Sequence, residues 1–127
     1  MKLNRAAVQH ARSLIRNGHV VKDDRDAWSE DQPSTAEENE FIRRHGIAAY
    51  GTWHLGIDEQ KDPDTKAHYR FPYGDFSDVH RCAVISAESR AGQYKYFEIE
   101  KAAASLHSLI DGTKHPDRIR RRSHAHA

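Results

Sequence analysis

The sequence predicts a mostly helical α+β domain, in which about four helices pack around one two-stranded antiparallel β-hairpin. Two observations lead to this fold class. Apolar residues recur at helical spacing near both ends of the chain, whereas aromatic residues alternate with other residues in the middle. The length of 127 residues suits one domain. We expect that domain to span residues 1–112, followed by a flexible, basic, histidine-containing tail over residues 113–127.

A first helix is expected between Asn4 and the Asn17-Gly18 pair. Asparagine is a favoured N-cap residue, and glycine often follows the last residue of a helix. The apolar residues between these signals recur at i, i+3 and i+4, which predicts one buried helix face: Ala7, Val8, Ala11, Leu14 and Ile15.

The next two segments are predicted to be a connector and a short helix. Residues 23–32 are acidic and show no hydrophobic period, so we expect a connector that brings Trp28 onto the domain. Ser34 and Glu37 have the spacing of a capping box, and a glycine follows the basic end of this segment. A helix is therefore expected over residues 35–45.

The middle of the chain is predicted to form the hairpin. Residues 50–57 and 69–73 alternate with a period of two, which is typical of strands with two different faces. The polar residues 58–67 between them are typical of a long charged loop. Pro72 cannot donate a backbone hydrogen bond, so the second strand is expected either to lie at a sheet edge or to end abruptly there.

Two further helices are predicted after the hairpin. One begins at Ser77 or Asp78 and extends to about residue 91, and the other extends from about residue 95 to residue 111. A glycine follows each segment. The first has a face rich in small residues, which favours close packing. We therefore expect the two helices to form an antiparallel pair against the hairpin.

Charge is sorted along the chain, although the net charge is only +1. Residues 1–22 carry five Lys or Arg and no acid, whereas residues 23–40 carry eight acids and one Arg. Such blocks are usual on solvated faces.

The single cysteine excludes an internal disulfide, no segment approaches ~20 apolar residues, and the N-terminal segment is too basic for a signal peptide. These features predict a cytoplasmic protein that does not enter a membrane.

One stretch of the chain resembles a known group of sequences. Residues 69–75 (YRFPYGD) are followed by Val79-His80-Arg81 and then by an alanine-rich helix pair that ends at Leu109-Ile110-Asp111. This arrangement, over residues 28–111, resembles a group of small bacterial and phage-borne proteins of unassigned activity. Related segments accompany phage head-maturation proteins, so the resemblance implies an accessory or assembly role. It implies no catalytic residue and no cofactor.

No motif in the sequence predicts catalysis. The glycines are scattered, so no phosphate-binding loop is expected. Cys82 shares an apolar helix face with Val79 and Ala83, which favours a buried structural thiol over a nucleophile. We therefore expect no enzymatic activity and no cofactor.

Histidine is abundant, with ten residues in the chain, but no metal-binding motif of fixed spacing occurs. His54 and His68 could face one another across the hairpin, and His80 follows the second strand. These three histidines are candidate metal ligands. The alternative is that they are ordinary surface or packing histidines.

Aromatic residues are concentrated on and beside the hairpin, and helices can cover only one face of such a ribbon. The other face is expected to bind a protein partner or a second copy of the chain. The alternative is that the aromatic residues form the core of a thin domain. The candidate partner-binding residues are Tyr50, Trp53, Tyr69, Phe71, Tyr73 and Phe76.

The basic tail is the second candidate surface. Clustered arginines neutralise phosphates without reading a base sequence, so non-specific nucleic-acid binding is expected there. The sequence thus favours a non-enzymatic binding or assembly protein, with a nucleic-acid accessory protein and a histidine-based metal protein as alternatives. The candidate nucleic-acid-binding residues are Arg118, Arg120, Arg121 and Arg122.

Overall fold

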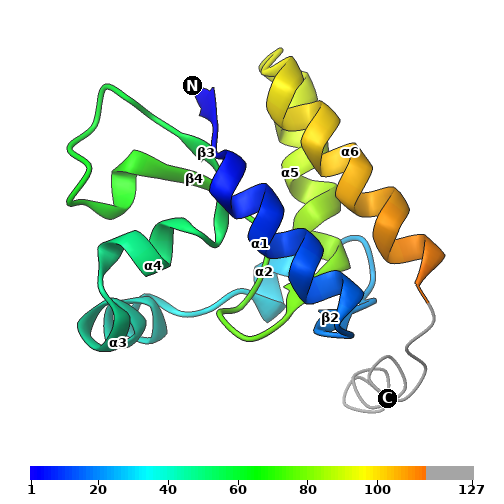
Figure 1. The fold of residues 1–127 in the computed structure, drawn as a ribbon, viewed down its shortest axis with the longest axis horizontal. Coiled ribbons are helices and arrows are strands. Elements are labelled where there is room, and N and C mark those ends of the chain that lie inside the picture. Colours follow the sequence, from blue (N-terminus) through cyan, green and yellow to red (C-terminus); the bar gives the residue numbers. More distant parts are fainter. Residues whose placement is uncertain (114–127) are drawn as a thin grey trace.

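A computed structural model describes residues 1–113 and shows an α+β domain that is mostly helical (Figure 1). Within these residues the chain forms six helices, one 3₁₀ turn and five short strands. The helical elements are α1 (Arg5–Arg16), α2 (Trp28–Asp31), α3 (Thr35–His45), α4 (Ile47–Gly51), the turn at Lys66–His68, α5 (Arg81–Gln93) and α6 (Phe97–Gly112). The strands are β1 (Lys2–Leu3), β2 (Val20–Val21), β3 (His54–Ile57), β4 (Tyr69–Pro72) and β5 (Val79–His80).

The hairpin is present, but it is one part of a larger strand arrangement. Strands β3 and β4 pair antiparallel, and β1 adds to the other side of β3 to give the order β1-β3-β4. Strands β2 and β5 form a separate parallel pair in which Val21 lies opposite His80. The expectation of a single two-stranded hairpin was therefore wrong. Strands of two residues are too short to show an alternating pattern in the sequence.

Two element boundaries also differ from those expected. The first hairpin strand begins at His54, because residues 47–51 form the short helix α4. The helix expected from Ser77 or Asp78 begins only at Arg81, because the two residues before it form β5. The second difference arises where a tertiary contact overrides a local preference, since Val79 pairs with Val20 rather than continuing a helix.

The core lies between α1, the helix pair α5–α6 and the inner face of β3. Helices α5 and α6 form the expected antiparallel pair, and α1 crosses between this pair and the hairpin (Figure 1). The buried face expected for the first helix is confirmed at Ala7, Val8, Ala11 and Ile15. No helix within residues 1–113 is both long and apolar enough to cross a membrane.

The capping box of α3 is confirmed. The backbone N–H of Glu37 donates to Ser34 Oγ at 3.1 Å, and the backbone N–H of Ser34 donates to Glu37 Oε1 at 3.0 Å. Helix α3 has no buried residue, so little packing compensates for a lost cap. We expect Ser34→Ala to lower the free energy of unfolding by about 1 kcal/mol, measured by urea denaturation. Thr35→Ala is the control, and an equal effect of both variants would contradict a capping role.

Candidate functional site

A groove with a cavity of about 510 Å³ lies along β4 and α5. We call it the hairpin groove. Residues of β4 form one wall, and one face of α5 forms the other. The N-terminus, the α2 region, α3, α4, β3 with the residue after it, and the turn between α5 and α6 supply the rest of the lining. The lining residues are Met1, Trp28, Gln32, Glu38, Tyr50, His54, Asp58, Tyr69, Arg70, Phe71, Pro72, Ala83, Ser86, Ala87, Arg90, Tyr94 and Tyr96.

The six aromatic residues predicted to bind a partner fall into two groups. Tyr50, Tyr69 and Phe71 line the groove. The other three do not line it. Trp53 and Tyr73 are buried core residues whose rings stack with centroids 5.4 Å apart, and Phe76 stacks on Phe41 of α3 with centroids 4.4 Å apart.

Two further tyrosines complete the aromatic lining of the groove. Tyr94 and Tyr96 lie in the turn between α5 and α6, with ring centroids 6.0 Å apart. Tyr94 is 58% exposed, which is unusual for so large a side chain. These two tyrosines were not predicted to belong to the site. The available signal for their role was their position in the turn between two helices. The sequence pattern gives no reason to expect aromatic side chains to be buried there.

Two arginines of the groove form no ion pair with another charged side chain that the structure describes. Within residues 1–113, neither Arg70 of β4 nor Arg90 of α5 has an ion-pair partner. Both are exposed. Glu38, in contrast, is already engaged, because Lys66 Nζ donates to its Oε1 at 3.1 Å. The remaining carboxylate of the lining, Asp58, accepts the backbone N–H of Gln60 at 3.1 Å, so the groove offers a ligand two arginines and this one carboxylate.

His54 lies beneath the groove as a neutral ring. It is 4% exposed, and its Nδ1–H donates to the backbone oxygen of Tyr50 at 2.9 Å. Burial lowers the pKa of His54 to about 4, although this hydrogen bond opposes the shift. The ring also lies against the rings of Tyr50 and Tyr69. His54 thus supports the groove by packing and hydrogen bonding, without a charge at neutral pH.

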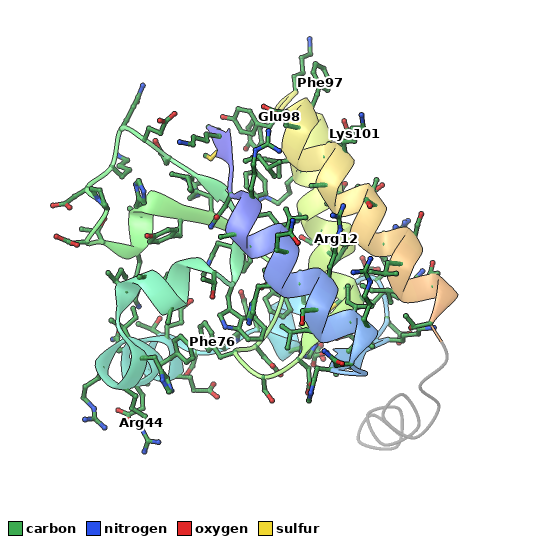
Figure 2. All side chains as sticks on the ribbon, in the orientation of Figure 1. Arg12, Arg44, Phe76, Phe97, Glu98 and Lys101 are labelled. Carbon is green, nitrogen blue, oxygen red and sulfur yellow. The ribbon has the colours of Figure 1, made fainter. Side chains whose placement is uncertain are left out.

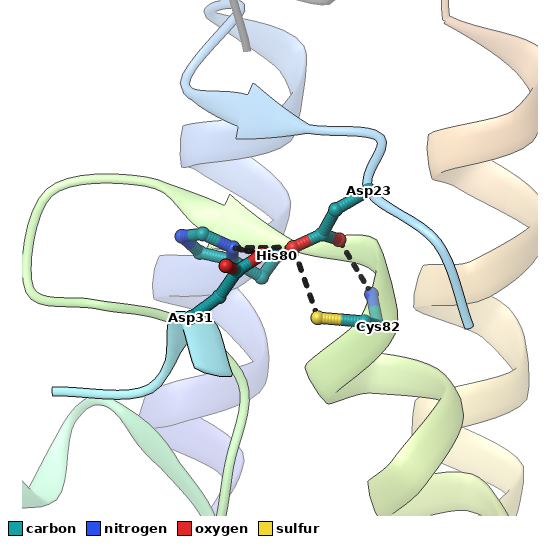
Figure 3. A group of neighbouring side chains, drawn as sticks. All are labelled: Asp23, Asp31, His80 and Cys82. Carbon is teal, nitrogen blue, oxygen red and sulfur yellow. Dashed lines mark hydrogen bonds and ion pairs between the residues drawn. The ribbon is translucent and has the colours of Figure 1, made fainter. Parts of the chain in front are cut away.

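A second candidate site lies behind the groove wall. Four side chains with metal-binding atoms meet there: Asp23, Asp31, His80 and Cys82, which we call the His80 cluster (Figure 3). The parallel pairing of β2 with β5 places the second residue after β2 beside the end of β5. For this reason Asp23 meets both His80 and Cys82, while α2 supplies Asp31 from the side.

The His80 ring is fully buried between two carboxylates. Its Nδ1 lies 2.7 Å from Asp23 Oδ2, and its Nε2 lies 2.8 Å from Asp75 Oδ2. Burial alone lowers the pKa of His80, but the hydrogen bonds to Asp23 and Asp75 raise it to about 9. Without a metal ion the ring is therefore an imidazolium held by both carboxylates.

Cys82 is confirmed as a buried residue. Its backbone N–H donates to Asp23 Oδ1 and its thiol donates to Asp23 Oδ2, both at 2.9 Å. Burial and the negative charge of Asp23 raise the pKa of the thiol. Because a nucleophilic cysteine needs a lowered pKa, this environment does not activate Cys82.

The three histidines predicted as metal ligands are not brought together. His54 lies under the groove, and His68 Nδ1–H donates to the backbone oxygen of Lys61 in the loop before β4. Of the three, only His80 belongs to the group of metal-binding side chains found within residues 1–113. Its aspartate neighbours were missed because Asp23 is 57 positions from His80, in a segment interpreted as a connector.

The arginines predicted to bind nucleic acid, Arg118, Arg120, Arg121 and Arg122, lie outside the described residues.

Comparisons of the chain with protein-family models, with curated proteins and with solved structures found no match. A function is therefore argued from the hairpin groove and the His80 cluster.

Proposed function

We propose that the protein is a non-enzymatic binding or assembly protein that holds an acidic segment of a partner protein in the hairpin groove. The observation that carries this proposal is the pair of arginines, Arg70 and Arg90, on opposite walls of an aromatic groove. An accessory role in assembly agrees with the resemblance of the YRFPYGD stretch to phage-borne proteins.

The charges of the groove favour an anionic ligand. Arginine binds carboxylates through two parallel N–H donors, so two unmatched guanidinium groups suit an acidic partner. Of the groove's own carboxylates, Glu38 is held by Lys66 and does not compete for them, and Asp58 accepts a backbone N–H from Gln60.

The aromatic lining favours a peptide segment with apolar side chains between its acids. Tyrosine and arginine are enriched where protein surfaces bind one another, because each combines a large contact area with hydrogen-bonding groups. A cavity of about 510 Å³ accommodates a few side chains. Helix α6 carries no part of this lining, and α3 contributes Glu38 to it.

Selection from a library of random peptides tests the proposal. We expect the full-length protein to enrich peptides in which Asp or Glu alternates with aromatic or aliphatic residues. A fluorescent copy of a selected peptide should bind about tenfold more weakly to the double variant Arg70→Ala/Arg90→Ala, measured by anisotropy. Arg12→Ala is the matched control, because Arg12 lies on α1 outside the groove (Figure 2).

Other outcomes of the selection decide against the groove. Enrichment of basic peptides, or no enrichment, would contradict an acidic ligand. Equal binding by the double variant and by Arg12→Ala would place the ligand elsewhere. A single-stranded oligonucleotide that competes with the peptide, and loses binding steeply with added salt, would instead favour the nucleic-acid alternative.

A further inference from the structure

We propose that the His80 cluster is a binding site for one divalent transition-metal ion, and that its donor set fits Zn²⁺ best. Four donors converge there: a ring nitrogen of His80, Cys82 Sγ and one carboxylate oxygen each from Asp23 and Asp31. These atoms all lie within 4.8 Å of one another (Figure 3). No part of the hairpin-groove proposal depends on this site.

The chemistry of the donors selects the class of ion. Ca²⁺ and Mg²⁺ prefer oxygen ligands alone, whereas a thiolate and an imidazole favour Zn²⁺ and related transition metals. Zn²⁺ accepts sulfur, nitrogen and carboxylate oxygen in a four-coordinate arrangement. The His80 cluster offers all three donor types and four ligands in total.

The surroundings of His80 supply a second, independent observation. A metal-binding histidine usually donates its other ring N–H to a carboxylate, which fixes the ring and its tautomer. His80 Nε2 lies 2.8 Å from Asp75 Oδ2 on the side away from Asp23. Asp75 is itself held, because the backbone N–H groups of Ser77 and Asp78 donate to its Oδ1. This support orients Nδ1 toward the other three donors.

Two of the ligand separations need only a small adjustment to suit a bound ion, whereas a separation as wide as 4.8 Å must close by more than about 1 Å. Ligand atoms around tetrahedral Zn²⁺ are separated by about 3.3–3.5 Å, given bond lengths near 2.0–2.3 Å. His80 Nδ1 now lies 2.7 Å from Asp23 Oδ2 and 3.9 Å from Asp31 Oδ2. Binding requires the first separation to widen and the second to narrow, each by less than about 1 Å. The protons on Nδ1 and Sγ pass to the buffer as the metal bonds form.

The burial of the ligand side chains indicates that a bound ion would have a structural rather than a catalytic role. The side chains of Asp23 and His80 are fully buried, and that of Asp31 is 10% exposed. A site with four protein ligands leaves no open position for a substrate or a reactive water. The ion would instead join the segment after β2 to α2 and to the start of α5.

Titration of the metal-free full-length protein with Co²⁺ tests this proposal. Tetrahedral Co²⁺ absorbs visible light, and a bound thiolate adds a charge-transfer band in the near ultraviolet. Cys82 is the only cysteine in the sequence, so that band reports this site even when histidines elsewhere bind Co²⁺. We expect the band to saturate at one equivalent, to disappear on addition of Zn²⁺, and to be absent in Cys82→Ser.

Two further variants separate metal binding from folding. Asp75→Asn leaves the four ligands in place but removes the carboxylate behind His80, so we expect Co²⁺ to bind about 10–100-fold more weakly. His68→Ala removes a histidine outside the cluster and should leave Co²⁺ binding unchanged. Wild-type protein that shows no thiolate band at a few equivalents of Co²⁺ would overturn the proposal, whatever the stability of the variants.

Discussion

Replacement of Trp53 by alanine is expected to lower the free energy of unfolding by about 3–5 kcal/mol. Trp53 is only 5% exposed, its ring stacks on Tyr73 with centroids 5.4 Å apart, and His10 contacts it edge-on at 5.0 Å. Alanine would leave a cavity among rigid rings that cannot close around it. For a domain of this size the thermal midpoint should fall by roughly 10–20 °C, measured by circular dichroism.

Phe97→Ala is the matched control for Trp53. Phe97 is 65% exposed at the start of α6 and extends away from the domain (Figure 2). Its removal should change the free energy of unfolding by no more than about 0.5 kcal/mol. If Trp53→Ala behaved like Phe97→Ala, the inward face assigned to β3 and its preceding turn would be wrong.

Acidification from about pH 6.5 to pH 4 is expected to destabilise the fold by about 3 kcal/mol through His54. Burial lowers the pKa of His54 in the folded protein from 6.5 to about 4. The unfolded chain therefore binds a proton across this interval while the folded chain does not. A proton bound only by the unfolded state favours unfolding, so stability falls as the pH falls.

Urea denaturation at several pH values between 4 and 7 measures this effect, with His54→Asn as the comparison. The asparagine amide can still donate to the backbone oxygen of Tyr50, but it does not titrate. The variant should therefore lose less stability than the wild type over this interval. His10, whose pKa burial also lowers, contributes in the same direction in both proteins. Parallel curves for the two proteins would contradict the role assigned to His54.

The sequence was most informative where structure is local. Asn4 and Ser34 were recognised as N-caps from their own type and near neighbours, and both cap their helices. The same holds for the β3–β4 hairpin, whose partners are close in sequence. Strands β1, β2 and β5 were missed, because each has two residues and a partner far along the chain.

The candidate sites were predicted only in part, for a related reason. The aromatic hairpin does line a groove, but periodicity alone could not separate the buried Trp53 and Tyr73 from the groove residues Tyr69 and Phe71. Each aromatic side chain suits either environment. The His80 cluster was not predicted, because nothing local in the acidic connector marks Asp23 for burial.

The parallel pair β2–β5 also bears on the order in which the chain folds. Asp23 and Cys82 are 59 positions apart, whereas Ile57 and Tyr69, paired in the hairpin, are only twelve apart. By loop-closure entropy alone, joining the more distant pair costs about 1.4 kcal/mol more. The hairpin and the α5–α6 pair need no such long loop, so they can assemble first. The His80 cluster can then form only when the N-terminal third of the chain has docked onto the hairpin and the helix pair. Its formation therefore distinguishes the fully folded chain from its partly folded precursors.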